Sequence, residues 1–170
     1  MKNNIGFVGM MGSGKTTIAR ELNRVLKDYT FVDIDAEIEK GSGKKISEIF
    51  LRFGEPRFRM LESEKIRKFL AGKKQIISFG GGAFEDEFNR EIILKNCLTI
   101  YLKASPEEIF NRIKAETHRP LLSKNFSIER IKEILRKRET NYQKADTVID
   151  TTGKSPYDIV VEILKVIRNG

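Results

Sequence analysis

The stretch GMMGSGKTT, residues 9–17, decides the fold of this 170-residue chain. It fits the pattern G-x-x-x-x-G-K-[ST], in which glycines let the backbone curl so that successive N–H groups point inward. The context that this pattern requires is present: a strand-like run (IGFV, 5–8) precedes it, and TTIARELNRVLK (16–27) follows with apolar residues at helical spacing. A glycine-rich loop that served only as a turn would not need a strand directly before it and a helix directly after it. The stretch therefore predicts a nucleoside triphosphate site, formed by backbone N–H groups and the N-terminus of a helix.

The residues of this loop have distinct expected roles. We expect Lys15 to reach the β- and γ-phosphates and the Thr16 hydroxyl to bind Mg²⁺. The motif leaves open whether the nucleotide is a switch, a fuel or a phosphoryl donor. The Asn-Lys-x-Asp string that recognises guanine in GTPases is absent, and QIISF (75–79) runs into three glycines where a motor ATPase would carry an acidic residue. The residues expected to bind the nucleotide here are Gly12, Ser13, Gly14, Lys15, Thr16 and Thr17.

A carboxylate is available from FVDIDAEIE (31–39), where a predicted strand ends. Alternation along that strand would place Asp33 and Asp35 on the same side. The carboxyl ends of the strands line the ligand-binding crevice in such folds, so both carboxylates would lie in it and could have different roles. One would hold Mg²⁺ through water, and the other would hold an acceptor hydroxyl and take its proton. The alternative interpretation is a solvated pair that stabilises the N-terminus of a following helix.

Short apolar runs alternate with amphipathic stretches along the whole chain. This alternation predicts an α/β fold with a parallel sheet and helices on both faces. Two helices are expected to begin at Ser-Pro pairs, with Ser105 and Ser155 as their N-caps. Glu108 would close a capping box with Ser105, and Asp158 occupies the corresponding position after Ser155. The predicted strands are 5–9, 30–34, 75–79, 98–102 and 146–150.

Composition and charge bound the function. The net charge is +8, which fits a solvated basic surface, a nucleic-acid binder or a site for small anions, and no basic tail stands apart to favour nucleic acid. Cys97 is the only cysteine, which fits a reducing compartment. No run approaches the roughly 20 apolar residues of a membrane span, and the start of the chain does not fit a signal peptide, so we expect a cytoplasmic protein without a membrane partner.

Six segments together carry a resemblance to a known family, the shikimate kinases, which are small ATP-dependent enzymes of the aromatic amino-acid pathway. Their order and spacing over the chain are more specific than any one of them. The gluconate kinases share the phosphate loop and the size but fit the RFR, GGG and HRPLL segments less well. The segments are GMMGSGKTT (9–17), DID (33–35), GEPRFRMLE (54–62), GGGA (80–83), THRPLL (117–122) and RKRETNY (136–142).

The resemblance implies a fold, a reaction and a set of partners. It implies a P-loop NTPase three-layer αβα sandwich with a five-stranded parallel sheet of order 2-3-1-4-5, forming a single kinase domain over 1–170. The substrate-binding region would span about 33–61 and a lid about 113–125. The reaction would be phosphorylation of the 3-hydroxyl of shikimate by ATP with Mg²⁺, giving 3-phosphoshikimate and ADP. The resemblance further favours a monomer with a small-molecule substrate and no nucleic-acid partner.

Site roles follow from the resemblance position by position. Asp35 resembles the aspartate that binds substrate hydroxyls and acts as base, and Asp33 resembles the one near Mg²⁺. Arg59 and Arg138 resemble the arginines that hold the substrate carboxylate, a role that suits a planar, two-pronged cation. The remaining assignments are Glu62 orienting the substrate arginine, Gly80, Gly81 and Gly82 approaching the substrate, Arg112 stacking near adenine, Arg119 as the lid arginine that closes over phosphate and substrate, and Lys154 in an adenine-side loop. The catalytic residues would be Asp35, Lys15 and Arg119.

Three alternatives remain open at this stage. A gluconate or nucleoside monophosphate kinase would keep the phosphate loop, although we find no base-recognition pocket for a nucleotide acceptor. A nucleotide-gated binding protein would lack transfer, and a basic RNA-binding domain would show affinity that falls steeply with salt. His118, the only histidine, is interpreted as a surface residue of the lid. Pro56 predicts that the helix carrying Arg59 begins near it.

Overall fold

Five parallel strands form one sheet in the order β2-β3-β1-β4-β5, as expected. The computed structural model describes residues 2–114 and 127–169. In the centre, Ile5 of β1 pairs with Ile76 of β3 on one side and with Leu98 of β4 on the other. The strands are β1 (Asn4–Val8), β2 (Thr30–Asp33), β3 (Gln75–Ser78), β4 (Cys97–Lys103) and β5 (Thr147–Asp150), close to the predicted runs.

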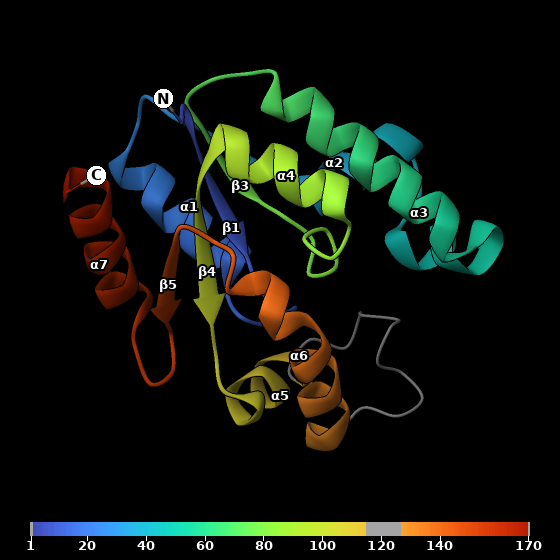
Figure 1. Cartoon of the computed structure of the whole chain (residues 1–170). Helices are drawn as coiled ribbons and strands as arrows, with labels where there is room; N and C mark the ends of the chain where they lie inside the picture. The colour runs from blue at the N-terminus through green and yellow to red at the C-terminus, as the bar shows by residue number, and fades with distance from the viewer. Residues whose placement is uncertain (1, 115–126, 170) are drawn as a thin grey trace.

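Helices cover both faces of this sheet and give the expected three layers (Figure 1). One face carries α1 and α7, which pack against each other, and the other carries α3 and α4. A pair formed by α5 and α6 lies beyond the carboxyl ends of β4 and β5 (Figure 1). The helices are α1 (Lys15–Val25), α2 (Ile34–Ser42), α3 (Ile46–Leu70), α4 (Glu87–Asn96), α5 (Pro106–Lys114), α6 (Ile128–Tyr142) and α7 (Pro156–Asn169).

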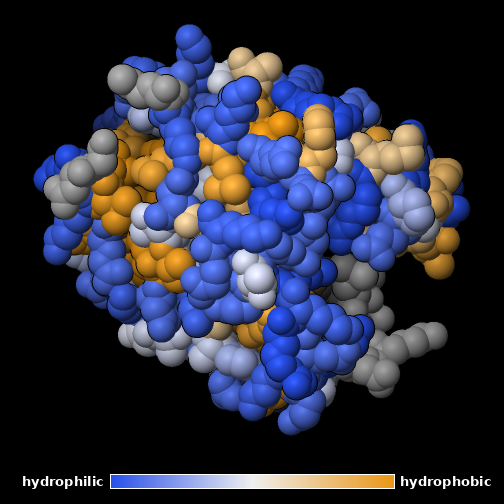
Figure 2. Space-filling model, viewed as in Figure 1, coloured by the Kyte–Doolittle hydropathy of each residue, from blue (hydrophilic) through white to orange (hydrophobic). Residues whose placement is uncertain are grey.

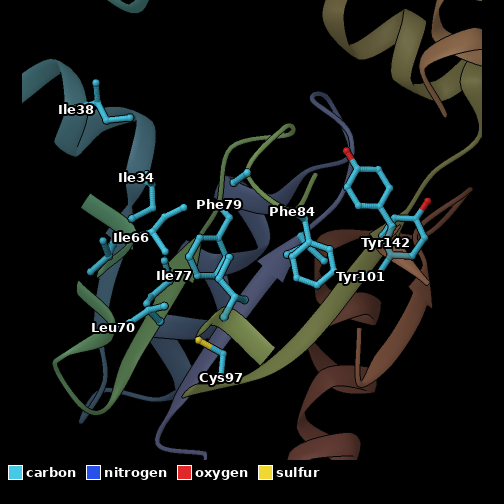
Figure 3. Close-up of a cluster of buried hydrophobic side chains, with 14 of the residues drawn as sticks. Ile34, Ile38, Ile66, Leu70, Ile77, Phe79, Phe84, Cys97, Tyr101 and Tyr142 are labelled. Atoms are coloured by element: carbon cyan, nitrogen blue, oxygen red, sulfur yellow. The ribbon is translucent and has the colours of Figure 1, made fainter. Parts of the chain in front are cut away.

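The two faces bury separate hydrophobic cores. Successive strand residues point to opposite faces, so Ile76 belongs to the core under α1 and α7, whereas Ile77 belongs to the core under α2, α3 and α4. The second of these cores also contains Phe79, Phe84 and a pair of tyrosines (Figure 3). Burial of both sheet faces explains why the strands are continuous apolar runs.

The long helix α3 is broken at Gly54, whose φ of 79° and ψ of 173° lie outside the helical region. Glycine adopts such a positive φ without steric penalty. A second helical segment then begins beside Pro56, as its position predicted. This break gives the segment that carries Arg59 a direction of its own.

One predicted helix cap is wrong in part. The Ser105 hydroxyl accepts from the Glu108 N–H at 3.2 Å, but Glu108 does not close the box, because the Ser105 N–H donates to Thr152 Oγ1. The Glu108 carboxylate is engaged elsewhere, as described below. At α7 the reciprocal arrangement does form, with Ser155 Oγ accepting from the Asp158 N–H and the Ser155 N–H donating to Asp158 Oδ2.

Polar side chains cover most of the face shown in Figure 2, with apolar patches between them. Several large apolar side chains are exposed, including Leu51, Phe53 and Met60 of α3. Among the helices described, none is both long and apolar enough to cross a membrane.

Candidate active site

A cavity of about 870 Å³ opens at the carboxyl ends of β1, β2 and β3. This is the edge at which parallel sheets of this type bind ligands. Residues far apart in the sequence meet there, from the phosphate loop, α2, α3, the loop after β3, α5 and α6. The predicted site residues that line it are Gly12, Gly14, Lys15, Thr16, Thr17, Asp33, Asp35, Arg59, Glu62, Gly80, Gly81, Gly82, Arg112 and Arg138.

The phosphate loop has the backbone geometry of an anion cradle. Gly9, Gly12 and Gly14 have φ values of 140°, 77° and 96°, which other residues rarely adopt. A side chain at Gly12 would meet Ile113 at 2.8 Å. Helix α1 begins at Lys15 with no side-chain cap and no acidic residue in its first turn, so none of its own side chains occupies the N-terminus that would attract an anion.

Lys15 lies inside this loop rather than on the surface. Its Nζ donates to the carbonyl oxygens of Gly9 at 2.7 Å and Met10 at 2.9 Å. Ser13 is buried behind the loop and does not line the cavity. The loop therefore holds its curled shape partly through its own lysine.

Thr16, Asp33 and Ser78 bring three oxygen-bearing side chains together. Thr16 Oγ1 donates to Asp33 Oδ2 at 2.6 Å and lies 3.2 Å from Ser78 Oγ. Hydroxyl and carboxylate oxygens are ligands that Mg²⁺ prefers, so the residues present fit this ion. Ser78 was missed from the sequence, although its place at the carboxyl end of β3, beside Phe7 of β1, was a usable signal.

The predicted strand alternation of Asp33 and Asp35 is wrong. Strand β2 ends at Asp33, and helix α2 begins at Ile34. Asp33 caps this helix, because its Oδ1 accepts from the Ala36 N–H at 3.1 Å. Asp35 therefore lies in the first turn of α2, where a carboxylate is favoured by the helix dipole. Both side chains nevertheless line the same cavity.

Arg59 is held between two carboxylates. Its Nη1 donates to Glu62 Oε2 at 2.7 Å, and its Nε and Nη2 donate to Glu55 Oε1 at 3.2 and 3.0 Å. Partial burial opposes the charge of Arg59, but these two carboxylates outweigh it and raise the pKa of the guanidinium. Burial raises the pKa of Glu62, whose side chain is 1% exposed, and Arg59 offsets part of that rise.

The three glycines after β3 pack so closely against charged side chains that a Cβ at Gly80 or Gly82 would collide with them. A Cβ at Gly80 would lie 2.5 Å from Glu62 Oε1 and 3.1 Å from Asp35 Oδ1. A Cβ at Gly82 would lie 2.5 Å from Arg59 Nη2. At Gly81 the nearest side chain is Arg138, with its Nη1 3.6 Å away from the Cβ position. The loop thus packs against all of the charged groups expected to hold the acceptor.

Arg112 of α5 lines the cavity beside the phosphate loop. Its Nη1 donates to the Gly12 carbonyl at 3.3 Å, and its Nη2 pairs with Glu108 at 2.7 Å. The other oxygen of Glu108 accepts from the Gly153 N–H at 2.7 Å. Glu108 therefore joins α5 to the loop after β5, which explains why it does not cap α5.

Besides Ser13, one other predicted residue within the described ranges does not line the cavity. Lys154 donates to both carboxylate oxygens of Glu162 on α7, at 2.7 and 3.0 Å, and does not line the cavity. Arg119 and most of the predicted lid, like His118, lie outside the described residues.

Sequence reasoning also missed an apolar wall from α3. The rings of Phe50 and Phe58 lie 4.7 Å apart, and Arg59 lies over the Phe58 ring at 5.2 Å. The position of Phe58 directly before Arg59 was a signal for this wall. The other lining residues that were not predicted are Met11, Glu39, Lys45, Ile46, Ser47, Ser78 and Phe79.

Comparisons with known proteins agree with one another. A sequence model of the family described as shikimate kinase matches residues 11–168. The chain is 47% identical over 165 residues to a shikimate kinase of Persephonella marina, covering 97% of this chain and 99% of the relative. It is 43% identical over 162 residues to one of Thermodesulfovibrio yellowstonii, covering 95% and 93%.

Solved structures give the same picture. The structure of shikimate kinase from Acinetobacter baumannii in complex with shikimate has a TM-score of 0.94 and 32% identity, covering 99% of this chain and 94% of that one. Shikimate kinase from Aquifex aeolicus has a TM-score of 0.84 and 32% identity, covering 97% and 96%.

Proposed function

This chain belongs to the shikimate kinase family, and we infer that it transfers the γ-phosphoryl group of ATP to a hydroxyl of shikimate in the aromatic amino-acid pathway. The observation that carries this conclusion is one cavity in which a phosphate loop faces Asp35 and two arginines. A nucleotide-binding module alone would not need a carboxylate and a pair of guanidinium groups opposite the cradle.

We propose that Arg59 and Arg138 hold the acceptor carboxylate and thereby orient the ring. Guanidinium groups bind carboxylates through paired, charge-assisted hydrogen bonds. Glu62 would fix the position of Arg59, and the glycines after β3 would let the backbone approach the acceptor hydroxyls. Phosphoryl transfer depends mainly on positioning and charge neutralisation, so this orientation accounts for much of the catalysis.

Asp35 is proposed to hold the acceptor 3-hydroxyl and take its proton. The hydroxyl oxygen forms a bond to the γ-phosphorus, the bond from that phosphorus to the bridging oxygen breaks, and ADP leaves with the electron pair. The products are 3-phosphoshikimate and ADP. Lys15, on the opposite side of the cavity, would neutralise charge on the transferred group.

Thr16 and Asp33 are the residues that would hold Mg²⁺, with Asp33 acting through water. The ion would supply positive charge to the phosphate oxygens. Arg112 is proposed to contact adenine, and Arg119 to close over the phosphates as part of a lid at about 113–125. We further propose a cytoplasmic monomer without a nucleic-acid partner. Light scattering would test whether the protein is a monomer, and a filter-binding assay at low salt would test for nucleic-acid binding.

The testing experiment measures ADP release, coupled to NADH oxidation, with MgATP and either shikimate, gluconate or AMP. Release that depends on shikimate alone is the expected result. Turnover with another acceptor would keep the kinase and overturn the arginine roles. If folded protein bound ATP but released no ADP with any of the three acceptors, the chain would be a nucleotide-gated binding protein instead.

A further inference from the structure

Tyr142, the last residue of α6, contacts the glycine loop from inside the protein. Its side chain is buried, with 1% exposed, and its hydroxyl donates to the Gly81 carbonyl at 2.5 Å. The ring stacks on Tyr101 of β4, with centroids 5.0 Å apart and planes 29° apart (Figure 3). The hydroxyl is therefore fixed in place by a ring that has little room to move.

Arg138 lies one helical turn before Tyr142 on α6. Burial raises the pKa of Tyr142 to about 12, while the nearby charge of Arg138 opposes that rise. The hydroxyl is thus protonated at neutral pH and remains a donor to Gly81. Arg138 and Gly81 are also neighbours, since Arg138 Nη1 would lie 3.6 Å from a Cβ at Gly81.

Gly81 therefore lies between two residues of α6, with its carbonyl bound by the Tyr142 hydroxyl and its Cα side facing the Arg138 guanidinium. The carbonyls of Gly80 and Gly82 accept from backbone N–H groups of the same loop, at Ala83 and Glu85, whereas the Gly81 carbonyl accepts from the Tyr142 side chain. A second contact supports the junction, where Asn141 Nδ2 donates to Glu85 Oε2 at 3.3 Å. The end of α6 is therefore attached to the loop after β3 at two successive residues.

We propose that the Tyr142 hydroxyl is a positioning group for the acceptor site, which sets the spacing between Arg138 and the Gly80–Gly82 loop. The proposal rests on the proposed function, because it assumes that Arg138 and this loop contact the acceptor. With the spacing set in advance, the acceptor does not have to order the two elements when it binds. Gly81 also adjoins the phosphate loop, with its Cβ position 3.1 Å from the Met11 nitrogen, but the hydroxyl of Tyr142 is bonded to Gly81 and not to that loop.

The chain offers a closely matched control. Tyr101 is the stacking partner of Tyr142, is equally buried, and donates its hydroxyl to Glu139 Oε2 at 2.7 Å. Tyr142→Phe and Tyr101→Phe each remove one hydroxyl from the same cluster and keep the ring. Only the first variant removes a contact to the acceptor site.

The experiment compares kcat and the KM values for shikimate and ATP in the two variants and the wild type, with thermal unfolding of all three. We expect Tyr142→Phe to lower kcat/KM for shikimate about tenfold, the scale of one lost buried hydrogen bond, with KM for ATP unchanged within about twofold. Tyr101→Phe should unfold at a temperature similar to that of Tyr142→Phe and keep the wild-type kcat/KM for shikimate. Unchanged kcat/KM in Tyr142→Phe, or equal losses in both variants, would overturn the proposal.

A double-mutant cycle provides a second test that does not depend on the size of the single effect. In an Arg138→Lys background, Tyr142→Phe should cause a much smaller further loss of kcat/KM for shikimate than it does alone. Equal losses in both backgrounds would show that the hydroxyl does not act through Arg138. A wild-type enzyme inactive with shikimate would instead contradict the proposed function itself.

Discussion

Thr16 and Asp33 are joined by a 2.6 Å hydrogen bond from Oγ1 to Oδ2, so that the first turn of α1 meets the end of β2. The two residues are 17 positions apart in the chain, yet they place a hydroxyl and a carboxylate side by side next to the phosphate loop. The other oxygen of Asp33 caps α2. One side chain therefore supports both the proposed ion site and the local fold, and substitutions can separate these effects.

Asp33→Asn should raise the Mg²⁺ concentration needed for half-maximal activity while leaving thermal stability nearly unchanged, because asparagine is an equally good helix cap. Asp33→Ala should show the same Mg²⁺ effect and lose a further ~1 kcal/mol of stability with the cap. Titration of activity with Mg²⁺ and chemical denaturation of both variants test this. Equal Mg²⁺ requirements in wild type and Asp33→Asn would contradict the assignment.

Asp35→Asn should lower kcat by about 10²-fold or more, the usual contribution of a general base, with ATP affinity nearly intact. Glu37→Gln is the matched control, because Glu37 shares the first turn of α2 but does not line the cavity. Steady-state kinetics and calorimetric ATP binding would be measured on both. A kcat within threefold of wild type in Asp35→Asn would remove the proton-transfer role.

Arg59→Ala should weaken shikimate binding by roughly 2–3 kcal/mol, the scale of lost charge-assisted hydrogen bonds. Arg52→Ala removes an arginine of the same helix that pairs with Glu48 on the surface, and it should change binding little. Calorimetric titration with shikimate distinguishes the two. Unaltered shikimate affinity in Arg59→Ala would exclude the carboxylate role.

Glu108→Ala should raise KM for ATP severalfold without a comparable change in KM for shikimate. The carboxylate holds both Arg112 and the Gly153 N–H, so its loss frees two elements on the nucleotide side. Glu107→Ala, at the exposed neighbouring position with a 3.5 Å contact to Lys132, is the control. Equal KM values for ATP in the two variants would mean that Glu108 does not shape the nucleotide site.

Glu62→Gln should change how stability depends on pH. The folded pKa of Glu62 is raised above its ordinary value of 4.5, mainly by burial, so its contribution to stability is fully present below pH 4.5 and is lost as pH rises through the folded pKa. The stability of Glu62→Gln relative to wild type should therefore increase as pH rises from about 4.5, by about 1.4 kcal/mol for each pH unit between the two pKa values.

Denaturation of wild type and Glu62→Gln between pH 4 and 8 measures this difference, with the exposed Glu64→Gln of the same helix as control. At the same time KM for shikimate should rise in Glu62→Gln, because the pairing with Arg59 weakens. A relative stability that stays flat or falls with pH would show that the charge of Glu62 is not disfavoured in the folded protein.

The fold was predictable because its signals are local. The apolar runs that became strands are bounded by turns, and the phosphate loop fixes which strand precedes which helix. The Ser155 cap was predicted correctly because all of its partners lie within one turn of α7. The prediction for the Ser105 cap was wrong in part because the Ser105 N–H donates to Thr152, 47 positions away. No local pattern reveals such a partner.

The cavity was predictable only where residue chemistry marked it. Most of the charged residues assigned from sequence line it, since charged groups at strand ends and in glycine-rich loops are conspicuous. Ser78 and Tyr142 carry no such mark: a serine at a strand end and a tyrosine at a helix end are common. Asp35 was placed on a strand because the pattern could not show that Asp33 would end β2 by capping α2.

The separation of the two cores by the sheet has a consequence for how this chain can change over evolutionary time. Neighbouring residues such as Ile76 and Ile77 pack on opposite faces of the sheet. A substitution in one core therefore leaves the packing of the other nearly intact. The face under α2 and α3 holds Phe58, the residue before Arg59, whereas the face under α1 holds Ile18 and Ala19 of the helix that follows the phosphate loop. Substitutions that repack the residues around Phe58 can therefore accumulate without repacking the first helix after the phosphate loop.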